Sequence, residues 1–410
     1  MKRSKPFLLL MLADFVARSA YQMGKTPLLP IFAAALGASG AFLGLIVSVS
    51  TVTGLFLKPL FGILSDRWGR RVWLFVGAGF FAVTPFLYRF VQTPEQLLAL
   101  RLAHGLATAI YGPVTLAYIA ELSREARRHS PVHQKTAENI GWFQMARSGG
   151  YIVGPALAGW LLLSLEPVAV FTLIGIISCG VFLPILHLPE TRPLKWRKRK
   201  DGSTSARPPI RQHIKNAIRD GGQSPAVWLT GGLEAVTFIA LYTLKAFLPL
   251  YALEAGVSIV LVGLFFSLNE AAHVLGKPFC GRLGDRWGYL PTISLGMLIL
   301  AAALPLVRLL DQGLLFLLPA ALMGLAQALI FPAAIAMVSD RISPQHLGAG
   351  MGLIGMMQNF GKVAGPILGG LAISALGYEA TLISLSLMLA LGAAIIWSFC
   401  APRKLINTSP

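Results

Sequence analysis

The sequence predicts an all-α membrane protein in which twelve transmembrane helices form two related halves of six. Three observations support this fold class. Of the 410 residues, 55% are hydrophobic and only 13% are charged, which is too apolar for a water-soluble protein. Long apolar segments follow one another, and a run of about 18 or more such residues can span a bilayer. A motif in the first half of the chain also recurs in the second half.

Gly- and Pro-containing turns separate the apolar segments and set the limits of the predicted spans. The first segment follows Lys2, Arg3 and Lys5 as a signal peptide would, but Asp14 interrupts it and no convincing cleavage site follows. We therefore interpret it as the first span. The twelve spans are expected at 7–35, 41–65, 71–91, 96–120, 137–163, 167–188, 226–252, 258–281, 289–308, 314–337, 346–376 and 379–399.

The net charge of +18 would suggest a nucleic-acid partner in a soluble chain, but its distribution argues for a membrane. Lys and Arg gather before the first span, after spans 2 and 4, and in the connection between the halves. The loops on the opposite side contain neither residue. By the positive-inside rule both termini are cytoplasmic, the partner is the lipid bilayer, and no nucleic acid is expected.

An internal duplication organises the chain. The segment KPLFGILSDRWG at 58–69 recurs as KPFCGRLGDRWG at 277–288, with eight of twelve positions identical, and the same spacing relates Gly105 to Gly324. Two domains follow from it, an N-terminal six-helix bundle at 1–188 and a C-terminal one at 226–410. The basic segment 189–225 is expected to be a cytoplasmic linker that contacts anionic headgroups, with a regulatory partner as the alternative.

The segment GILSDRWGRR at 62–71 resembles the signature loop of the major facilitator superfamily, G-x-L-x-D-R-x-G-R-R. Span 4 is similar to that family's L-x-x-x-R-x-x-Q-G motif, with His104 in place of Gln. Spans 5 and 11 resemble its antiporter motif G-x(8)-G-x(3)-G-P-x(2)-G-G, with Ala158 replacing one Gly in span 5. The resemblance covers the whole chain, matches the twelve-span drug:proton antiporter group best, and implies the major facilitator fold of two pseudo-symmetric bundles.

The signature loop predicts a cytoplasmic latch. Asp66 lies at a tight glycine turn among arginines, where a carboxylate can accept hydrogen bonds from them and cap a helix N-terminus. A charge cluster that only sets topology is the alternative. The second copy lacks the paired arginines, so its latch should be weaker. The latch candidates are Gly62, Asp66, Arg67, Gly69, Arg70, Arg71, Asp285 and Arg286.

Small residues every four positions in spans 5 and 11 occupy one helical face, which allows a neighbouring backbone to approach closely. The resemblance implies that this glycine seam lies where the two halves meet. A sliding, gating seam and ordinary tight packing both remain open. The seam residues are Gly150, Gly154, Pro155, Gly159, Gly361, Gly365, Pro366 and Gly369.

Ionisable groups inside spans are costly in lipid and are functional candidates by default. Asp14, Arg18, Tyr21 and Lys25 form one polar stripe on span 1. The antiporter group tends to carry an acid about nine residues before a P-x-x-P element, a position that Arg18 occupies here. Three acids therefore compete as proton carrier. The proton-coupling candidates are Asp14, Glu234, Glu270, Arg101 and His104.

Basic groups outnumber these acids within the spans, which predicts an anionic or carboxylate-bearing, amphiphilic substrate. Aromatic and methionine side chains could supply an adaptable apolar wall, although plain packing is the alternative. The cavity candidates are Arg18, Tyr21, Lys25, Tyr111, Arg147, Phe238, Tyr242, Lys245, His273, Met357, Gln358 and Lys362; Lys58 and Lys277 complete the basic set nearer the cytoplasmic ends.

The sequence contains no phosphate-binding loop, H-E-x-x-H motif or nucleophile elbow, so enzymatic chemistry is not expected. The three cysteines show no metal-binding spacing, and no metal or cofactor is expected. We expect a secondary transporter in the plasma (inner) membrane, a monomer that exports its substrate by proton antiport and alternating access. Proton-coupled or passive uptake of a small metabolite is the alternative, and a membrane sensor with a transporter fold a remote one.

Overall fold

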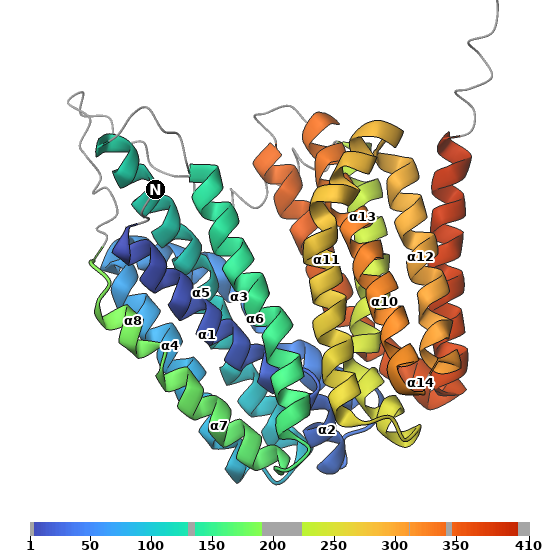
Figure 1. Ribbon diagram of the computed structural model, residues 1–410, viewed down its shortest axis with the longest axis horizontal. Helices are drawn as coiled ribbons and strands as arrows, with labels where there is room; N and C mark the ends of the chain where they lie inside the picture. The colour runs from blue at the N-terminus through green and yellow to red at the C-terminus, as the bar shows by residue number, and fades with distance from the viewer. Residues whose placement is uncertain (1–3, 130–135, 191–223, 311, 342–346, 401–410) are drawn as a thin grey trace, which may run out of the picture. The chain divides into compact units, whose positions relative to one another are not determined.

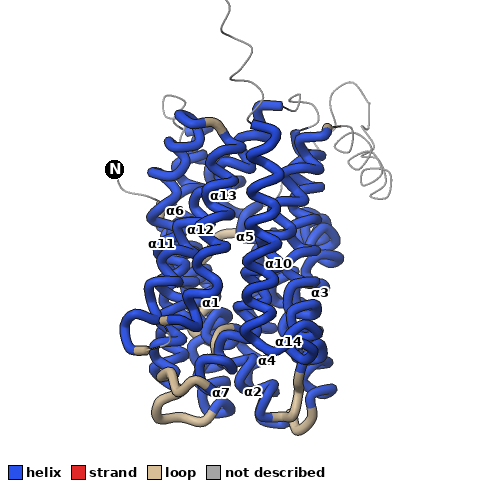
Figure 2. The backbone as a smooth tube through the Cα atoms, turned by 90° about the vertical axis from the view of Figure 1, so that its right-hand side faces the viewer, coloured by secondary structure: helices blue, strands red, loops and turns tan. Residues whose placement is uncertain are grey.

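The structure is a computed structural model that describes residues 4–129, 136–190, 224–310, 312–341 and 347–400. Within these ranges the chain forms helices joined by short loops, with no strand (Figure 2). In a bilayer only a helix or a closed barrel satisfies every backbone polar group, which fits this architecture. The predicted all-α fold class is confirmed. Most of the predicted linker, residues 191–223, lies outside the described residues.

Each predicted span coincides with one helix or with two consecutive helices (Figure 1). The first span is divided at Thr26, and the last two spans are joined into one long helix that changes direction at Gly377, whose φ is 81°. The helices of the first half are α1 (Lys5–Lys25), α2 (Leu28–Ala35), α3 (Gly40–Trp68), α4 (Arg70–Leu87), η1 (Tyr88–Phe90), α5 (Pro94–His129), α6 (Thr136–Leu161), α7 (Pro167–Cys179) and α8 (Phe182–Leu186). Those of the second half are α10 (Pro225–Glu254), α11 (Ile259–Trp287), α12 (Tyr289–Leu309), η2 (Gly313–Phe316), α13 (Leu317–Arg341) and α14 (Leu347–Cys400).

The chain folds into two compact units. Unit 1 comprises Met1–Ala38 and Leu45–Ala206, and unit 2 comprises Ser39–Gly44 and Arg207–Pro410. The helix pairings of the two units correspond, since α1 packs on α6 and α4 on α5 in unit 1, while α10 packs on α14 and α12 on α13 in unit 2. The sequence duplication is therefore repeated in the way the helices pack.

Nine helical stretches of the described residues are long and apolar enough to cross a membrane. One of them, Gly350–Trp397, holds the last two predicted spans. Helices α1 and α6 are not among the nine, and they carry Asp14, Arg18 and Arg147, whose charges lower the mean hydropathy of a span. The two least apolar spans thus bring charge into the interior of unit 1.

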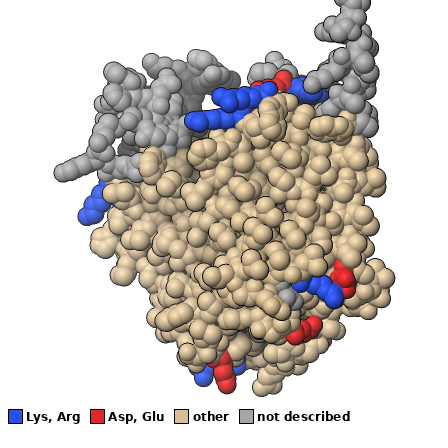
Figure 3. Space-filling model, turned by 45° about the vertical axis from the view of Figure 1, so that its right-hand side comes forward, with Lys and Arg blue, Asp and Glu red and all other residues tan. Residues whose placement is uncertain are grey.

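The outward-facing surface is apolar. Phe56, Phe279 and Leu387 are large side chains left mostly exposed, as expected of residues that contact lipid rather than water. On the face shown in Figure 3, Lys, Arg, Asp and Glu lie towards the ends of the helices, with a broad band between them that carries none of the four. Inside, unit 1 packs around residues such as Leu10 and Phe81, and unit 2 around residues such as Phe265 and Leu300.

Candidate functional site

A buried ion pair joins α1 to α6 in unit 1. Arg147 donates from Nε to Oδ2 of Asp14 at 2.8 Å and from Nη2 to Oδ1 at 2.9 Å. A third hydrogen bond, 3.0 Å long, runs from the same Nη2 to Oγ1 of Thr115 on α5. Asp14 is fully buried, so this two-pronged contact neutralises a carboxylate that could not remain charged alone in the interior.

Arg18 is a second cation beside the same carboxylate. Its Nε lies 3.6 Å from Oδ1 of Asp14, one helical turn away, and this distance is too long for a hydrogen bond. The Nε atom is fully buried and has no hydrogen-bond partner. One carboxylate therefore faces two guanidinium groups, and the cluster carries excess positive charge.

The corresponding place in unit 2 holds Glu234 and Gln358. Arg147 lies three residues before Gly150, and Gln358 lies three residues before Gly361, its counterpart in the repeated motif. Nε2 of Gln358 donates to Oε2 of Glu234 at 2.8 Å, while Oε1 of Glu234 is buried without a hydrogen-bond partner. The repeat thus keeps a carboxylate bound to the neighbouring helix but replaces its charged partner with an amide.

Glu234 has one cation in its surroundings. Lys362 acts on it electrostatically, and among the described residues the close partner of Glu234 is the uncharged amide of Gln358. The Lys362 ammonium lies over the ring of Phe238, 4.3 Å from its centroid. Phe238 and Lys362, both predicted for the cavity, are thereby placed together next to Glu234.

Arg101 and His104 form a separate buried cluster in unit 1. Nη2 of Arg101 donates to Oγ of Ser50 at 2.8 Å, and Nη1 lies 3.4 Å from both the Tyr88 hydroxyl and Nδ1 of His104. The ring of Tyr21 meets His104 edge-on, with centroids 5.5 Å apart. Within the described part of the chain no carboxylate pairs with Arg101, which is only 1% exposed. A buried cation held by uncharged partners is a strong functional candidate.

Glu270 on α11 has basic neighbours. Its Oε1 lies 3.8 Å from Nδ1 of His273, and both Lys245 and Lys277 act on it electrostatically. Lys245 itself lies over the ring of Tyr242, 5.5 Å from the centroid, much as Lys25 lies 5.7 Å from that of Tyr21. Glu270 is therefore a carboxylate among cations, as Asp14 is.

Two predicted cavity residues are packing residues in this structure. Tyr111 is fully buried, its ring fills the space beside Gly77, and it meets Phe81 edge-on. Met357 packs against α10 at Gly231, where a Cβ atom would lie 2.2 Å from its sulfur. Both side chains fill gaps between helices of one unit, and their part in a cavity wall stays a prediction.

The glycine seam also lies inside each unit. A Cβ on Gly154 would lie 2.7 Å from Cβ of Gln22 on α1, and one on Gly361 would lie 2.5 Å from the Ala235 carbonyl oxygen on α10. Gly150, Gly365 and Gly369 approach the same two helices. The close contacts of these glycines thus join spans 1 and 5, or 7 and 11, of one unit. Their place at the junction of the halves stays a prediction.

The side chain of Asp66, central to the predicted latch, lies outside the described residues. Arg70 beside it is buried and binds Oε1 of Glu121 on α5 through Nε at 3.1 Å and Nη2 at 3.0 Å. Oε1 of Glu190 accepts from the backbone N–H of Arg70 at 2.8 Å and so caps α4 after Gly69, whose φ is 97°. Sequence reasoning missed Glu121 and Glu190 as partners of Arg70.

Unit 2 repeats this contact without the ion pair. Tyr289 stands where unit 1 has Arg70, and its hydroxyl donates to Oδ2 of Asp340 on α13 at 2.5 Å. Asp340 in turn corresponds to Glu121 in the repeat. A hydroxyl–carboxylate bond replaces the arginine pair, in line with the weaker latch that we predict for the second copy.

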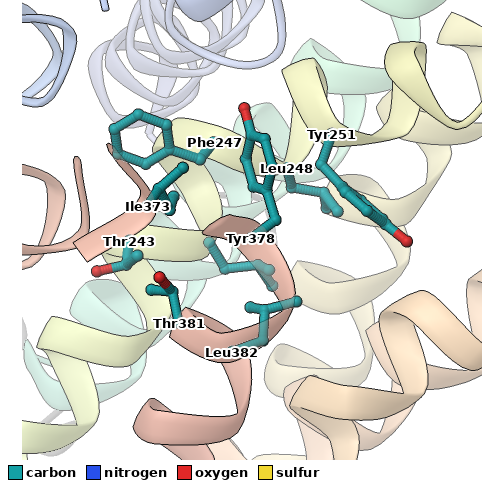
Figure 4. A pocket seen from close by; sticks show the side chains of 9 residues that line it. Thr243, Phe247, Leu248, Tyr251, Ile373, Tyr378, Thr381 and Leu382 are labelled. Carbon is teal, nitrogen blue, oxygen red and sulfur yellow. The ribbon is translucent and has the colours of Figure 1, made fainter. Parts of the chain in front are cut away.

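A small apolar cavity lies between α10 and α14 in unit 2, close to the bend at Gly377 (Figure 4). Its lining contains no charged side chain, so it is separate from the clusters around Glu234 and Glu270. The lining residues are Thr243, Leu244, Phe247, Leu248, Tyr251, Ile373, Tyr378, Thr381 and Leu382.

The chain belongs to the Major Facilitator Superfamily, whose family model matches residues 10–272 and 230–410. It is 25% identical over 397 residues to the multi-drug resistance efflux pump PmrA homolog of Lactococcus lactis, covering 93% of this chain and 91% of that protein. It is 28% identical over 178 residues to Multidrug resistance protein 1 of Bacillus subtilis, covering 42% of this chain and 44% of that protein.

The fold resembles the crystal structure of the nucleoside transporter NupG, with a TM-score of 0.78, 15% identity and coverage of 97% of this chain and 99% of that one. At this identity the likeness concerns the fold alone. The family match identifies an integral membrane transporter of small molecules, not an enzyme.

Proposed function

We propose that this transporter exports a small amphiphilic anion in exchange for protons, by alternating access across the plasma membrane. The relative in Lactococcus lactis that is named a multi-drug resistance efflux pump favours export. Alternating access presents a midplane site to each side of the membrane in turn, and coupling requires a group that gains and loses a proton during the cycle.

The observation that carries the proposal is the difference between the two repeated carboxylates. Asp14 is held by two hydrogen bonds from Arg147 and faces Arg18 as well. Glu234 is held by the amide of Gln358, and one of its oxygens is unpartnered. A proton can join Glu234 without breaking an ion pair, whereas protonation of Asp14 would leave two buried cations uncompensated.

Glu270 is a weaker candidate for the same physical reason, since His273 and two lysines surround it. We therefore assign the coupled proton to Glu234 and a structural role to Asp14. Arg101 and His104 remain candidates for a further part in coupling, because they form a buried polar cluster whose arginine lacks an acidic partner among the described residues.

The charge balance supports an anionic substrate. Within the described spans of unit 1, Arg18 and Arg101 are buried and Arg147 is 13% exposed, and Asp14 is the one buried carboxylate beside them. Buried charge without a partner is costly, and a bound anion would supply that partner. A cavity that attracts cations would instead contain more acidic than basic side chains.

Transport in proteoliposomes tests the function. Purified protein is reconstituted, a pH gradient is imposed, and the movement of matched amphiphiles, one anionic and one cationic, is followed. We expect the anion to move against the direction of proton flow and faster than the cation. Movement in the same direction as protons would indicate uptake by symport, and movement independent of the gradient would indicate a uniporter; either result contradicts the proposal.

A further inference from the structure

Arg18 has hydrogen-bonding capacity that the protein does not use. A guanidinium group carries five N–H donors, yet within the described residues Arg18 donates no hydrogen bond, and its buried Nε is unpartnered. Oδ1 of Asp14, its ion-pair partner, lies 3.6 Å from Nε and already accepts a 2.9 Å hydrogen bond from Arg147. The side chain is only 7% exposed, so bulk water does not replace the missing acceptors.

The charge around Arg18 is also unbalanced. Lys58 on α3 is an electrostatic neighbour of both Arg18 and Arg147, and repulsion acts among all three. Asp14 is the one carboxylate that the structure pairs with the two arginines in the described part of unit 1. Three cations and one carboxylate leave a local excess of two positive charges at this place.

The helices hold the guanidinium in place. Gly150 on α6 lies against Arg18, since a Cβ there would be 2.9 Å from Cβ of the arginine. Gly112 on α5 faces its other end, because a Cβ there would be 3.6 Å from Nη2. Because Gly150 and Gly112 have no side chains, there is room for the arginine between α1, α5 and α6.

The fold itself does not require a cation here. Arg18 follows Asp14 by four residues, and Phe238 follows Glu234 by four. A Cβ on Gly361 would lie 2.9 Å from Cβ of Phe238, just as a Cβ on Gly150 would lie 2.9 Å from Cβ of Arg18. Unit 2 therefore fills the equivalent position with an apolar side chain. Packing alone does not explain why unit 1 has a charged residue there.

We infer that Arg18 binds the anionic group of the substrate, a carboxylate or another oxyanion, with Lys58 contributing a second positive charge. The planar guanidinium offers two parallel donors to such a group, a geometry that lysine lacks. This inference rests on the proposed transport function, and it deepens that function by naming the group recognised and the residue that recognises it.

Equilibrium binding to the purified full-length protein tests the inference. The probes are 1-naphthaleneacetate and its uncharged amide, 1-naphthaleneacetamide, which differ only in the group under test. We expect the wild type to bind the acetate about tenfold more tightly, which corresponds to about 1.4 kcal/mol. Arg18→Gln should abolish this preference, and Arg18→Lys should keep part of it. Lys58→Gln should weaken acetate binding several-fold and leave amide binding unchanged.

Arg89→Gln is the matched control, because Arg89 is an exposed arginine at η1 in the same unit, and it should bind both probes as the wild type does. Amide binding and thermal unfolding check that each variant is folded. If Arg18→Gln does not fold, the acetate affinities of Arg18→Lys and Lys58→Gln test the inference instead. Wild-type acetate affinity in both of these, an unchanged preference in Arg18→Gln, or no preference in the wild type would overturn the inference.

Transport by the wild type separates the two claims. If a pH gradient drives transport while Arg18→Gln keeps the preference for acetate, the inference fails and the proposed function stands. If the gradient drives no transport while the preference depends on Arg18, the proton exchange fails and the anion site stands.

Discussion

Gln358 on α14 donates a 2.8 Å hydrogen bond to Oε2 of Glu234 on α10. In unit 1 the same two positions of the repeat hold Arg147 and Asp14, joined by two hydrogen bonds. Duplication has therefore produced two carboxylates with the same neighbours in the fold and different partners. Asp14 is held by the charged side chain of Arg147. Glu234 has no close ion pair within the described residues.

If Asp14 and Arg147 form a structural pair, removing one partner should cost more than removing both. Asp14→Asn leaves two buried guanidinium groups without a counter-ion, at a cost of about 3–5 kcal/mol. We expect that variant and Arg147→Gln each to lower the unfolding temperature in detergent. The double variant should recover part of the loss. A loss in the double variant equal to the sum of the two single losses would show that the two residues act independently.

The glycine contacts predict a position-dependent effect of one methyl group. Gly361→Ala would place Cβ 2.5 Å from the Ala235 carbonyl oxygen, so α10 and α14 must separate. Such overpacking costs about 1–3 kcal/mol and should slow transport. Gly352→Ala is the control on the same helix, because a Cβ there meets nothing within 4 Å. Similar unfolding temperatures and rates for the two variants would refute a specific role for the seam.

Asp66 remains a predicted latch residue. Asp66→Asn should slow transport and raise the cytoplasmic accessibility of engineered cysteines while expression is unchanged. Asp285→Asn, its counterpart in the second copy, should have a smaller effect, because Tyr289 replaces the arginine of the first copy there. Thiol labelling in membranes measures the accessibility. Unchanged labelling and rate in Asp66→Asn would exclude the latch.

Periodicity and duplication were enough to predict the spans, because a helix in lipid has a fixed length and an apolar surface. The same reasoning singled out Asp14, Glu234 and Gln358. It could not predict that Arg147 pairs with Asp14, since the two lie 133 residues apart and meet only once α1 packs on α6. Glu121 and Glu190 were missed because each lies near a span end, where an acid is unremarkable until its partner is known.

The partner helices of the glycine seam could not be predicted, for a related reason. Spacing every four residues predicts that a close neighbour exists, but it does not name that neighbour. Tyr111 and Met357 illustrate the same limit, since an aromatic or methionine in a span suits a cavity wall and a packed core equally well. In both cases the contacts of the side chain depend on helices far apart in the sequence.

Proton movement by Glu234→Gln tests the central claim most directly. The glutamine has nearly the same shape and can still bond Gln358, but it cannot take up a proton. Proteoliposomes containing a pH-sensitive dye report substrate-driven proton flux, and exchange of labelled substrate without a gradient reports binding and conformational change. We predict that Glu234→Gln keeps exchange and loses proton flux, whereas Glu270→Gln keeps both. Wild-type proton flux in Glu234→Gln would contradict the account.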